Sequence, residues 1–332
     1  MNTMKLTFVN VGYGEAILLE CPDPAFPGGC FTMLIDGGGA DPAEFDGNTS
    51  GRIPLREYLK ARALDRLDLV VNTHPHEDHV SGLLQAVEKI PVRELWQTLP
   101  PAFCREDMRE LDVSLARNRS QDKFLHALND CAALSRLVED ACGTVRQVRP
   151  EMCGELCRGL RYTVLGPSEE KLRDLEARCA ALYAEADEEA FLEKLNALDA
   201  MLNNHSIILL LEYGSTRILL PGDTNLAGYE GIDPALLKAD LFKVGHHGQR
   251  DGADEKLLQV VQARAVVCCA NSDRLYHSAD PKLMAAIKDH GARRYFSDCP
   301  PVKGESIPPH SALVFTVGDD GTIEAEYHER FK

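Results

Sequence analysis

Short apolar runs bounded by glycine, proline or polar residues recur through the first third of the chain. Runs of roughly four to eight residues with this pattern predict strands, whereas apolar positions that repeat at helical spacing predict helices. The expected strands are 4–9, 16–20, 31–36, 67–72 and 92–97, and the expected helices are 52–63 and 81–90. This interleaving of strands and helices is typical of an α/β fold.

The same pattern returns in the second half, after two long stretches of helical period at 105–142 and 168–201. No low-complexity linker divides the chain, so we predict a single domain spanning 1–332, with two sheets covered by helices and these stretches as helical insertions. The remaining expected strands are 144–149, 160–165, 206–213, 217–220, 240–245, one within 261–270, 294–297, 312–317 and 322–327, with a helix at 281–290.

Composition narrows the expected location and partners of the protein and leaves the predicted fold unchanged. The 332 residues are 44% hydrophobic and 27% charged, as in an ordinary globular protein. No apolar run approaches the roughly 18 residues that cross a bilayer, and residues 1–9 lack the apolar region of a signal peptide. We therefore predict a cytoplasmic location and no membrane partner. The net charge of −16 disfavours binding to a long nucleic acid duplex, which usually requires a basic face.

Candidate chemistry is concentrated directly after the predicted strand 67–72. His74, His76, Asp78 and His79 lie within six residues, and imidazole with carboxylate is a ligand set suited to zinc, manganese or iron. Four such residues exceed what one tetrahedral ion with an open water position requires, so two adjacent ions fit better. The alternative is a histidine-rich surface loop. It explains less well why the cluster begins where a buried strand ends.

This histidine cluster resembles the signature of the metallo-β-lactamase superfamily, His-x-His-x-Asp-His after a strand. Further segments in the same order resemble the hydrolase domain of the competence protein ComEC and its stand-alone relatives. The resemblance implies the αββα four-layer sandwich of the metallo-β-lactamase fold, interrupted by the helical insertions. The segments that carry it are Asn10-Val11-Gly12-Tyr13-Gly14-Glu15-Ala16, Ile35-Asp36-Gly37-Gly38, 73–82, Asn204-x-Ser206, Leu220-x-Gly222-Asp223 and Lys243-Val244-Gly245-His246-His247-Gly248.

By this resemblance the chain binds two divalent metal ions, with zinc expected and manganese or iron as alternatives. His74 and His76 are expected to hold one ion, and Asp78 and His79 the other. Asp223 is the expected bridging carboxylate, which would reduce the repulsion between two neighbouring cations. Taken alone, Asp223 after Gly222 would be read as an ordinary turn residue.

Three further histidines and one aspartate are assigned on the same grounds. One of His246 and His247 should bind metal while the other faces substrate or packs, and we favour His246 as the ligand. His205 is a candidate further ligand, although ComEC-like chains commonly have none there. Asp36 is expected either to orient a ligand imidazole or to form a turn before three glycines.

The predicted activity is metal-dependent hydrolysis, in which two cations lower the pKa of a water so that it attacks at neutral pH. We expect catalytic roles for Asp78, His247 and His277. His277 lies in a loop where it could contact a phosphate or protonate a leaving group, or merely cap a helix. A small-molecule or short single-stranded phosphodiester is the expected substrate. Hydrolysis of a carboxylic ester, lactone or thioester is the alternative, as is a metal-binding module without hydrolytic activity.

Overall fold

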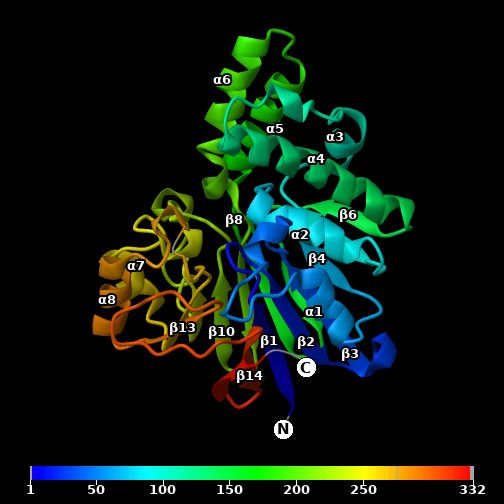
Figure 1. Cartoon of the computed structure of the whole chain (residues 1–332). Coiled ribbons are helices and arrows are strands. Elements are labelled where there is room, and N and C mark those ends of the chain that lie inside the picture. Colours follow the sequence, from blue (N-terminus) through cyan, green and yellow to red (C-terminus); the bar gives the residue numbers. More distant parts are fainter. Residues whose placement is uncertain (1, 274, 330–332) are drawn as a thin grey trace.

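The computed structural model describes residues 2–273 and 275–329, which form two sheets (Figure 1). The first sheet has eight strands in the order β15-β14-β1-β2-β3-β4-β5-β6. Its centre is antiparallel from β14 to β3, and β3 to β6 are parallel. The strands are β1 Thr3–Val9, β2 Ile17–Pro22, β3 Cys30–Ile35, β4 Leu69–Val71, β5 Glu94–Gln97, β6 Thr144–Gln147, β14 Ala312–Gly318 and β15 Ile323–His328.

The second sheet has seven strands in the order β13-β12-β11-β10-β9-β8-β7. Strands β10 to β13 run parallel, and β7 to β10 pair as antiparallel neighbours. The strands are β7 Cys153–Cys157, β8 Leu160–Gly166, β9 Ile208–Tyr213, β10 Thr216–Leu220, β11 Leu241–Lys243, β12 Ala265–Cys268 and β13 Arg293–Phe296.

Three hydrophobic cores separate four layers. One core lies between the two sheets, where Phe8 and Leu6 of β1 belong to the same buried cluster as Leu211 of β9. A second joins the outer face of the first sheet to its helices, and a third joins the outer face of the second sheet to α7 and α8. Figure 1 shows α1 and α2 on one flank and α7 and α8 on the other. The helices are α1 Leu55–Ala61, α2 Glu77–Val87, α7 Glu255–Val261 and α8 Pro281–Asp289.

The two helical stretches leave the sandwich between strands and return to it. The first, between β5 and β6, contains α3 Pro101–Glu106 and α4 Arg119–Asp140. The second, between β8 and β9, contains α5 Glu169–Tyr183 and α6 Glu188–Asp199. Figure 1 shows these four helices gathered at one end of the sheets. The two stretches pack together there, since Leu128 of α4 and Leu195 of α6 share one buried cluster.

Two elements were not expected from the sequence. Strand β7 lies at the edge of its sheet and is mostly exposed, so it lacks the apolar alternation that marks a strand. Helix α7 has only seven residues, and its clearest sequence signal is the Asp254 side chain that caps its first turn. Among the helices within the described ranges, none combines the length and the hydrophobicity that crossing a bilayer requires.

Candidate metal centre

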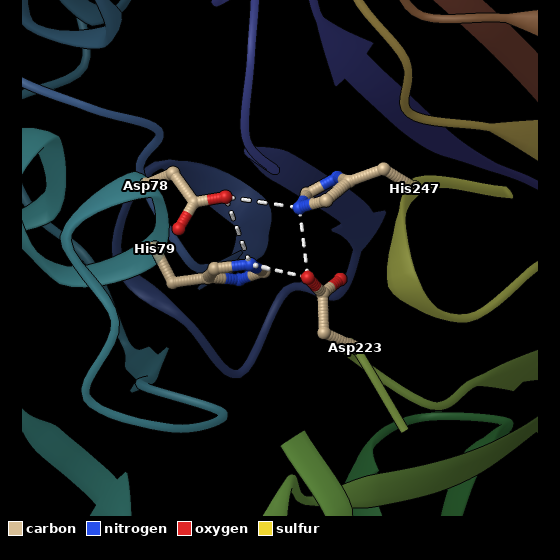
Figure 2. Close-up of side chains that lie close together, drawn as sticks. All are labelled: Asp78, His79, Asp223 and His247. Atoms are coloured by element: carbon tan, nitrogen blue, oxygen red, sulfur yellow. Dashed lines mark hydrogen bonds and ion pairs between the residues drawn. The ribbon is translucent and has the colours of Figure 1, made fainter. Parts of the chain in front are cut away.

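The first turn of α2, which follows β4, and the loops after β10 and β11 bring four side chains to one point (Figure 2). Nε2 of His247 lies 2.7 Å from Oδ2 of Asp223 and 2.9 Å from Oδ2 of Asp78. Nε2 of His79 lies 3.2 Å from Oδ2 of Asp223 and 3.7 Å from Oδ2 of Asp78. In the part of the chain that the structure describes, this is the one group of three or more side chains arranged to hold a metal ion.

The start of α2 and a tight turn after β11 orient these side chains. His76 is the N-terminal cap of α2, so Asp78 and His79 lie in its first turn, where the helix dipole favours a carboxylate. His246 and His247 both have a left-handed backbone, with φ of 47° and 51°. Strain of this kind in residues other than glycine is typical of functional sites. The turn places His247 in the buried cluster and leaves His246 at the surface of the cleft.

The outer nitrogen of each clustered imidazole is bonded to a protein oxygen. Nδ1 of His79 lies 2.8 Å from Oδ2 of Asp36, and Nδ1 of His247 lies 2.8 Å from the carbonyl oxygen of Cys269. Both oxygens act as acceptors, so each ring donates its Nδ1–H outward. The inner Nε2 atoms therefore face the carboxylates, which is how a histidine ligand is usually prepared for a metal ion.

His74 and His76 repeat this arrangement beside the cluster. Nδ1 of His74 lies 3.1 Å from Oγ1 of Thr73, whose hydroxyl donates to Asp36 over 2.6 Å. Nε2 of His76 lies 3.1 Å from Oδ1 of Asp199. The remaining nitrogens, Nε2 of His74 and Nδ1 of His76, lie 2.9 Å apart. Two ring nitrogens thus point at one position, and each would offer it a lone pair when the outer nitrogen of its ring carries the proton.

Electrostatics favour positive charge at the centre. Burial opposes the charged form of Asp223, but His247 and His79 outweigh burial and hold the pKa of that carboxyl well below its usual value. Burial also opposes protonation of His247, yet Asp223 and Asp78 raise the pKa of its ring to about 9. Burial lowers the pKa of His74 well below its usual value, so this ring is neutral.

The donor set of imidazole nitrogens and carboxylate oxygens fits divalent metal ions. Nε2 of His79 is buried and has no hydrogen-bond partner, although it is aimed at two carboxylates. A cation between these groups would satisfy this nitrogen and both oxygens together. One such position is formed by Asp78, His79, Asp223 and His247, and His74 and His76 lie next to it.

A buried lysine supports the central carboxylate from behind. Nζ of Lys243 lies 3.1 Å from Oδ1 of Asp223, donates to the carbonyl oxygen of Gly222 over 2.7 Å and pairs closely with Glu15. Burial alone would lower the pKa of Lys243, but Glu15 and Asp223 raise it, so the ammonium group stays charged. Oδ1 of Asp223 is thereby fixed, while Oδ2 faces the histidines.

Two histidines singled out in the sequence lie elsewhere. Nδ1 of His205 donates to the carbonyl oxygen of Met201, and its Nε2 lies 3.7 Å from Asp174 on α5. The ring of His205 thus faces an insertion helix on one side. The side chain of His277 is exposed, and its neighbour Tyr276 lines the cleft instead. Asp36, in contrast, contacts the imidazole of His79, as an orienting carboxylate should.

A cleft of about 290 Å³ opens over the centre. Lys123 of α4 and Asp199 at the end of α6 bring both insertions into its wall. Tyr13 and Tyr276 form another wall, with ring centroids 5.1 Å apart. The lining residues are Tyr13, His76, Glu77, Asp78, Ser120, Lys123, Phe124, Asp199, Asn203, Asp223, His246, Gln249 and Tyr276.

Comparison with known proteins identifies the family. A family model described as the metallo-beta-lactamase superfamily matches residues 27–271, which contain the whole candidate centre. The chain belongs to this superfamily. The resemblance and the αββα fold predicted from the sequence are confirmed, and the protein is a hydrolase of this superfamily with a candidate centre for divalent metal ions.

Two curated relatives are much longer than this chain. ComE operon protein 3 of Bacillus subtilis is 22% identical over 298 residues, which cover 87% of this chain and 31% of that protein. Recombination protein 2 of Haemophilus influenzae is 35% identical over 72 residues, or 22% of this chain and 9% of that protein. The similarity to the first relative thus extends over most of this chain, which spans about a third of that protein.

The similar solved structures are more distant in sequence than the first relative. A protein of Parabacteroides distasonis described as a metal-dependent hydrolase has 13% identity and a TM-score of 0.42, covering 89% of this chain and 93% of its own. Zinc-bound PqqB of Methylobacterium extorquens has 14% identity and a TM-score of 0.41, covering 85% and 84%.

Proposed function

We propose that this hydrolase cleaves small-molecule or short single-stranded phosphodiesters with the help of two divalent metal ions, zinc being the expected metal. The observation that carries the proposal is the convergence of Asp78 and Asp223 with imidazoles whose outer nitrogens are already bonded. One ion would be held by His74, His76 and Asp223, and the other by Asp78, His79, Asp223 and His247.

The charge of the cleft supports an anionic substrate that binds only with metal present. Four carboxylates line it, whereas its one lysine, Lys123, is already paired with Glu77 over 2.8 Å. An empty cleft would therefore repel a phosphodiester. Two bound cations would reverse the sign of the charge, generate hydroxide from water at neutral pH and stabilise charge that develops on the phosphoryl oxygens.

In this proposal His246 supplies a proton to the leaving group and His247 is the metal ligand, although the sequence analysis favoured His246 as the ligand. His246 lines the cleft, and its Nδ1 lies 2.8 Å from Oδ1 of Asp251. That bond leaves Nε2 free to face a substrate, and the His246 hydrogen bond holds the pKa of Asp251 below its usual value. A carboxylate-bound imidazole in a cleft is a common general acid. The exposed His277 stays a sequence-based candidate for the same task.

Hydrolysis of a bis(nitrophenyl) phosphate tests the proposed activity. We expect release of nitrophenol that stops when a chelator removes the metal and returns when zinc or manganese is added, because the acidic cleft cannot hold the anion alone. The matched panel is nitrophenyl acetate, a lactone and a thioester, assayed with the same metal-loaded protein. Faster turnover of the panel than of the phosphodiester, or turnover insensitive to the chelator, would refute the proposal.

Substituting the two adjacent histidines separates their roles. We expect His246→Gln to keep its full metal content but to lower kcat by about 100-fold or more, the usual contribution of a general acid. His247→Gln should lose metal, because its Nε2 faces both carboxylates. Elemental analysis and kcat measured on the same samples check this prediction. Metal loss in His246→Gln with metal retained in His247→Gln would reverse the assignment.

A further inference from the structure

The outer hydrogen-bond partner of His76 comes from an insertion and not from the sandwich. For His79 and His247 the partners are Asp36, directly after β3, and the backbone of Cys269, directly after β12. For His76 the partner is Asp199, the last residue of α6, which is 123 positions away in the chain.

This contact fixes which nitrogen of His76 carries a proton. An ionised carboxylate only accepts hydrogen bonds, so Nε2 of His76 must be the donor to Asp199. In the neutral ring, Nδ1 then carries the lone pair, and it is Nδ1 that faces Nε2 of His74 at 2.9 Å. The opposite tautomer would point a proton at the metal position.

The first insertion fixes the positions of both Asp199 and the imidazole of His76. Ser120 at the start of α4 donates to Oδ2 of Asp199 over 3.1 Å, and the ring of Phe124 packs edge-on against His76 with centroids 5.7 Å apart. About one turn before Asp199 on α6, Asn196 accepts a hydrogen bond of 3.0 Å from Gln121 of α4. The packing of α4 on α6 thus decides where the carboxylate lies.

We propose that Asp199 is the positioning residue of the metal site that contains His74 and His76. Through Asp199 and its partner Ser120, both insertions would help to orient a metal ligand. The inference rests on the metal-binding part of the proposed function. Under the ligand assignment proposed above, this site has fewer protein ligands than its neighbour. Its affinity therefore depends more strongly on how well the imidazole of His76 is oriented.

Zinc titration in the presence of a competing chelator tests the affinity. We expect Asp199→Ala to weaken one of two zinc sites by about 10- to 100-fold, the usual effect of removing an outer partner, and to leave the other unchanged. Asp199→Asn retains an acceptor oxygen and should recover part of the loss. Glu193→Ala removes an exposed carboxylate from the same helix and serves as the control. Equal weakening of both sites, or of neither, would overturn the proposal.

The ring tautomer gives a second readout that needs neither metal nor turnover. Nitrogen-15 NMR of the metal-free protein at mildly alkaline pH should show His76 protonated on Nε2. In Asp199→Ala the ring should shift toward a mixture of tautomers, with Asp199→Asn between the two. A wild-type ring protonated on Nδ1 would refute the role of Asp199. Loss of phosphodiester turnover alone would bear only on the proposed function.

Discussion

Replacing Asp223 by Asn should abolish most of the activity and at least one equivalent of bound metal. Oδ2 of Asp223 is the oxygen that both His79 and His247 approach, and a neutral amide cannot balance cations on that side. If the metal ions contribute several kcal/mol to stabilising the transition state, turnover should fall by about 10³-fold or more. Elemental analysis and turnover of a bis(nitrophenyl) phosphate measure the two effects.

The control for this substitution is Asp233→Asn, which changes the charge equally in an exposed turn where the carboxylate only accepts from Ala235. It should keep full metal content and turnover. Because Asn has nearly the shape of Asp, circular dichroism should show both variants folded. Unchanged metal content and activity in Asp223→Asn would show that this carboxylate is not a ligand.

Replacing Lys243 by Met should cost about 3–5 kcal/mol of unfolding free energy in the metal-free protein, the effect expected when one partner of a buried ion pair is removed. Lys243, Glu15 and Asp223 are almost completely buried, and the ammonium group bonds both carboxylates. Without it, two negative charges remain close together in the core. Denaturant unfolding followed by circular dichroism measures the loss.

A double variant shows how much of the lost unfolding free energy comes from unpaired buried charge and how much from lost packing. In Lys243→Met with Glu15→Gln, one of the stranded carboxylates is removed, and we expect part of the lost stability to return. Lys238→Met, an exposed lysine shortly before the same strand, should change the unfolding free energy by less than about 0.5 kcal/mol. A Lys243→Met protein as stable as the wild type would show that the buried pair contributes little.

The central cluster could be predicted because its signal is local. His74, His76, Asp78 and His79 are nearly contiguous and follow a buried strand, so proximity in sequence implies proximity in space. The family resemblance then added Asp223 and the histidine pair, which no spacing rule would connect. The four-layer architecture followed from the same motifs, since apolar periodicity alone indicated only an α/β fold.

The choice between His246 and His247 depended on a turn that sequence does not reveal. Both residues have a positive φ, and this left-handed turn sends one side chain into the core and the other into the cleft. The periodicities of strands and helices cannot predict where these two side chains point, because the turn belongs to neither a strand nor an α-helix. His205 is similar, because its orientation depends on the position of α5 in an insertion.

The role of Asp199 could not be predicted from the sequence, for a different reason. It is one of many acidic residues in a polar helical stretch, and only tertiary packing singles it out. Its two contacts, with His76 and Ser120, both reach across long separations in the chain. Lys123 is comparable, since it enters the cleft wall only because α4 packs against α2.

The centre takes its side chains from both sheets, which has a consequence for how the protein acquires metal. Asp78 and His79 follow a strand of the first sheet, while Asp223 and His247 follow strands of the second. Neither half of the chain alone presents more than two of these four groups. Both sheets must therefore fold and pack together before the full binding site for an ion exists. Metal would bind late, to a folded chain that it then stabilises, and would not nucleate folding.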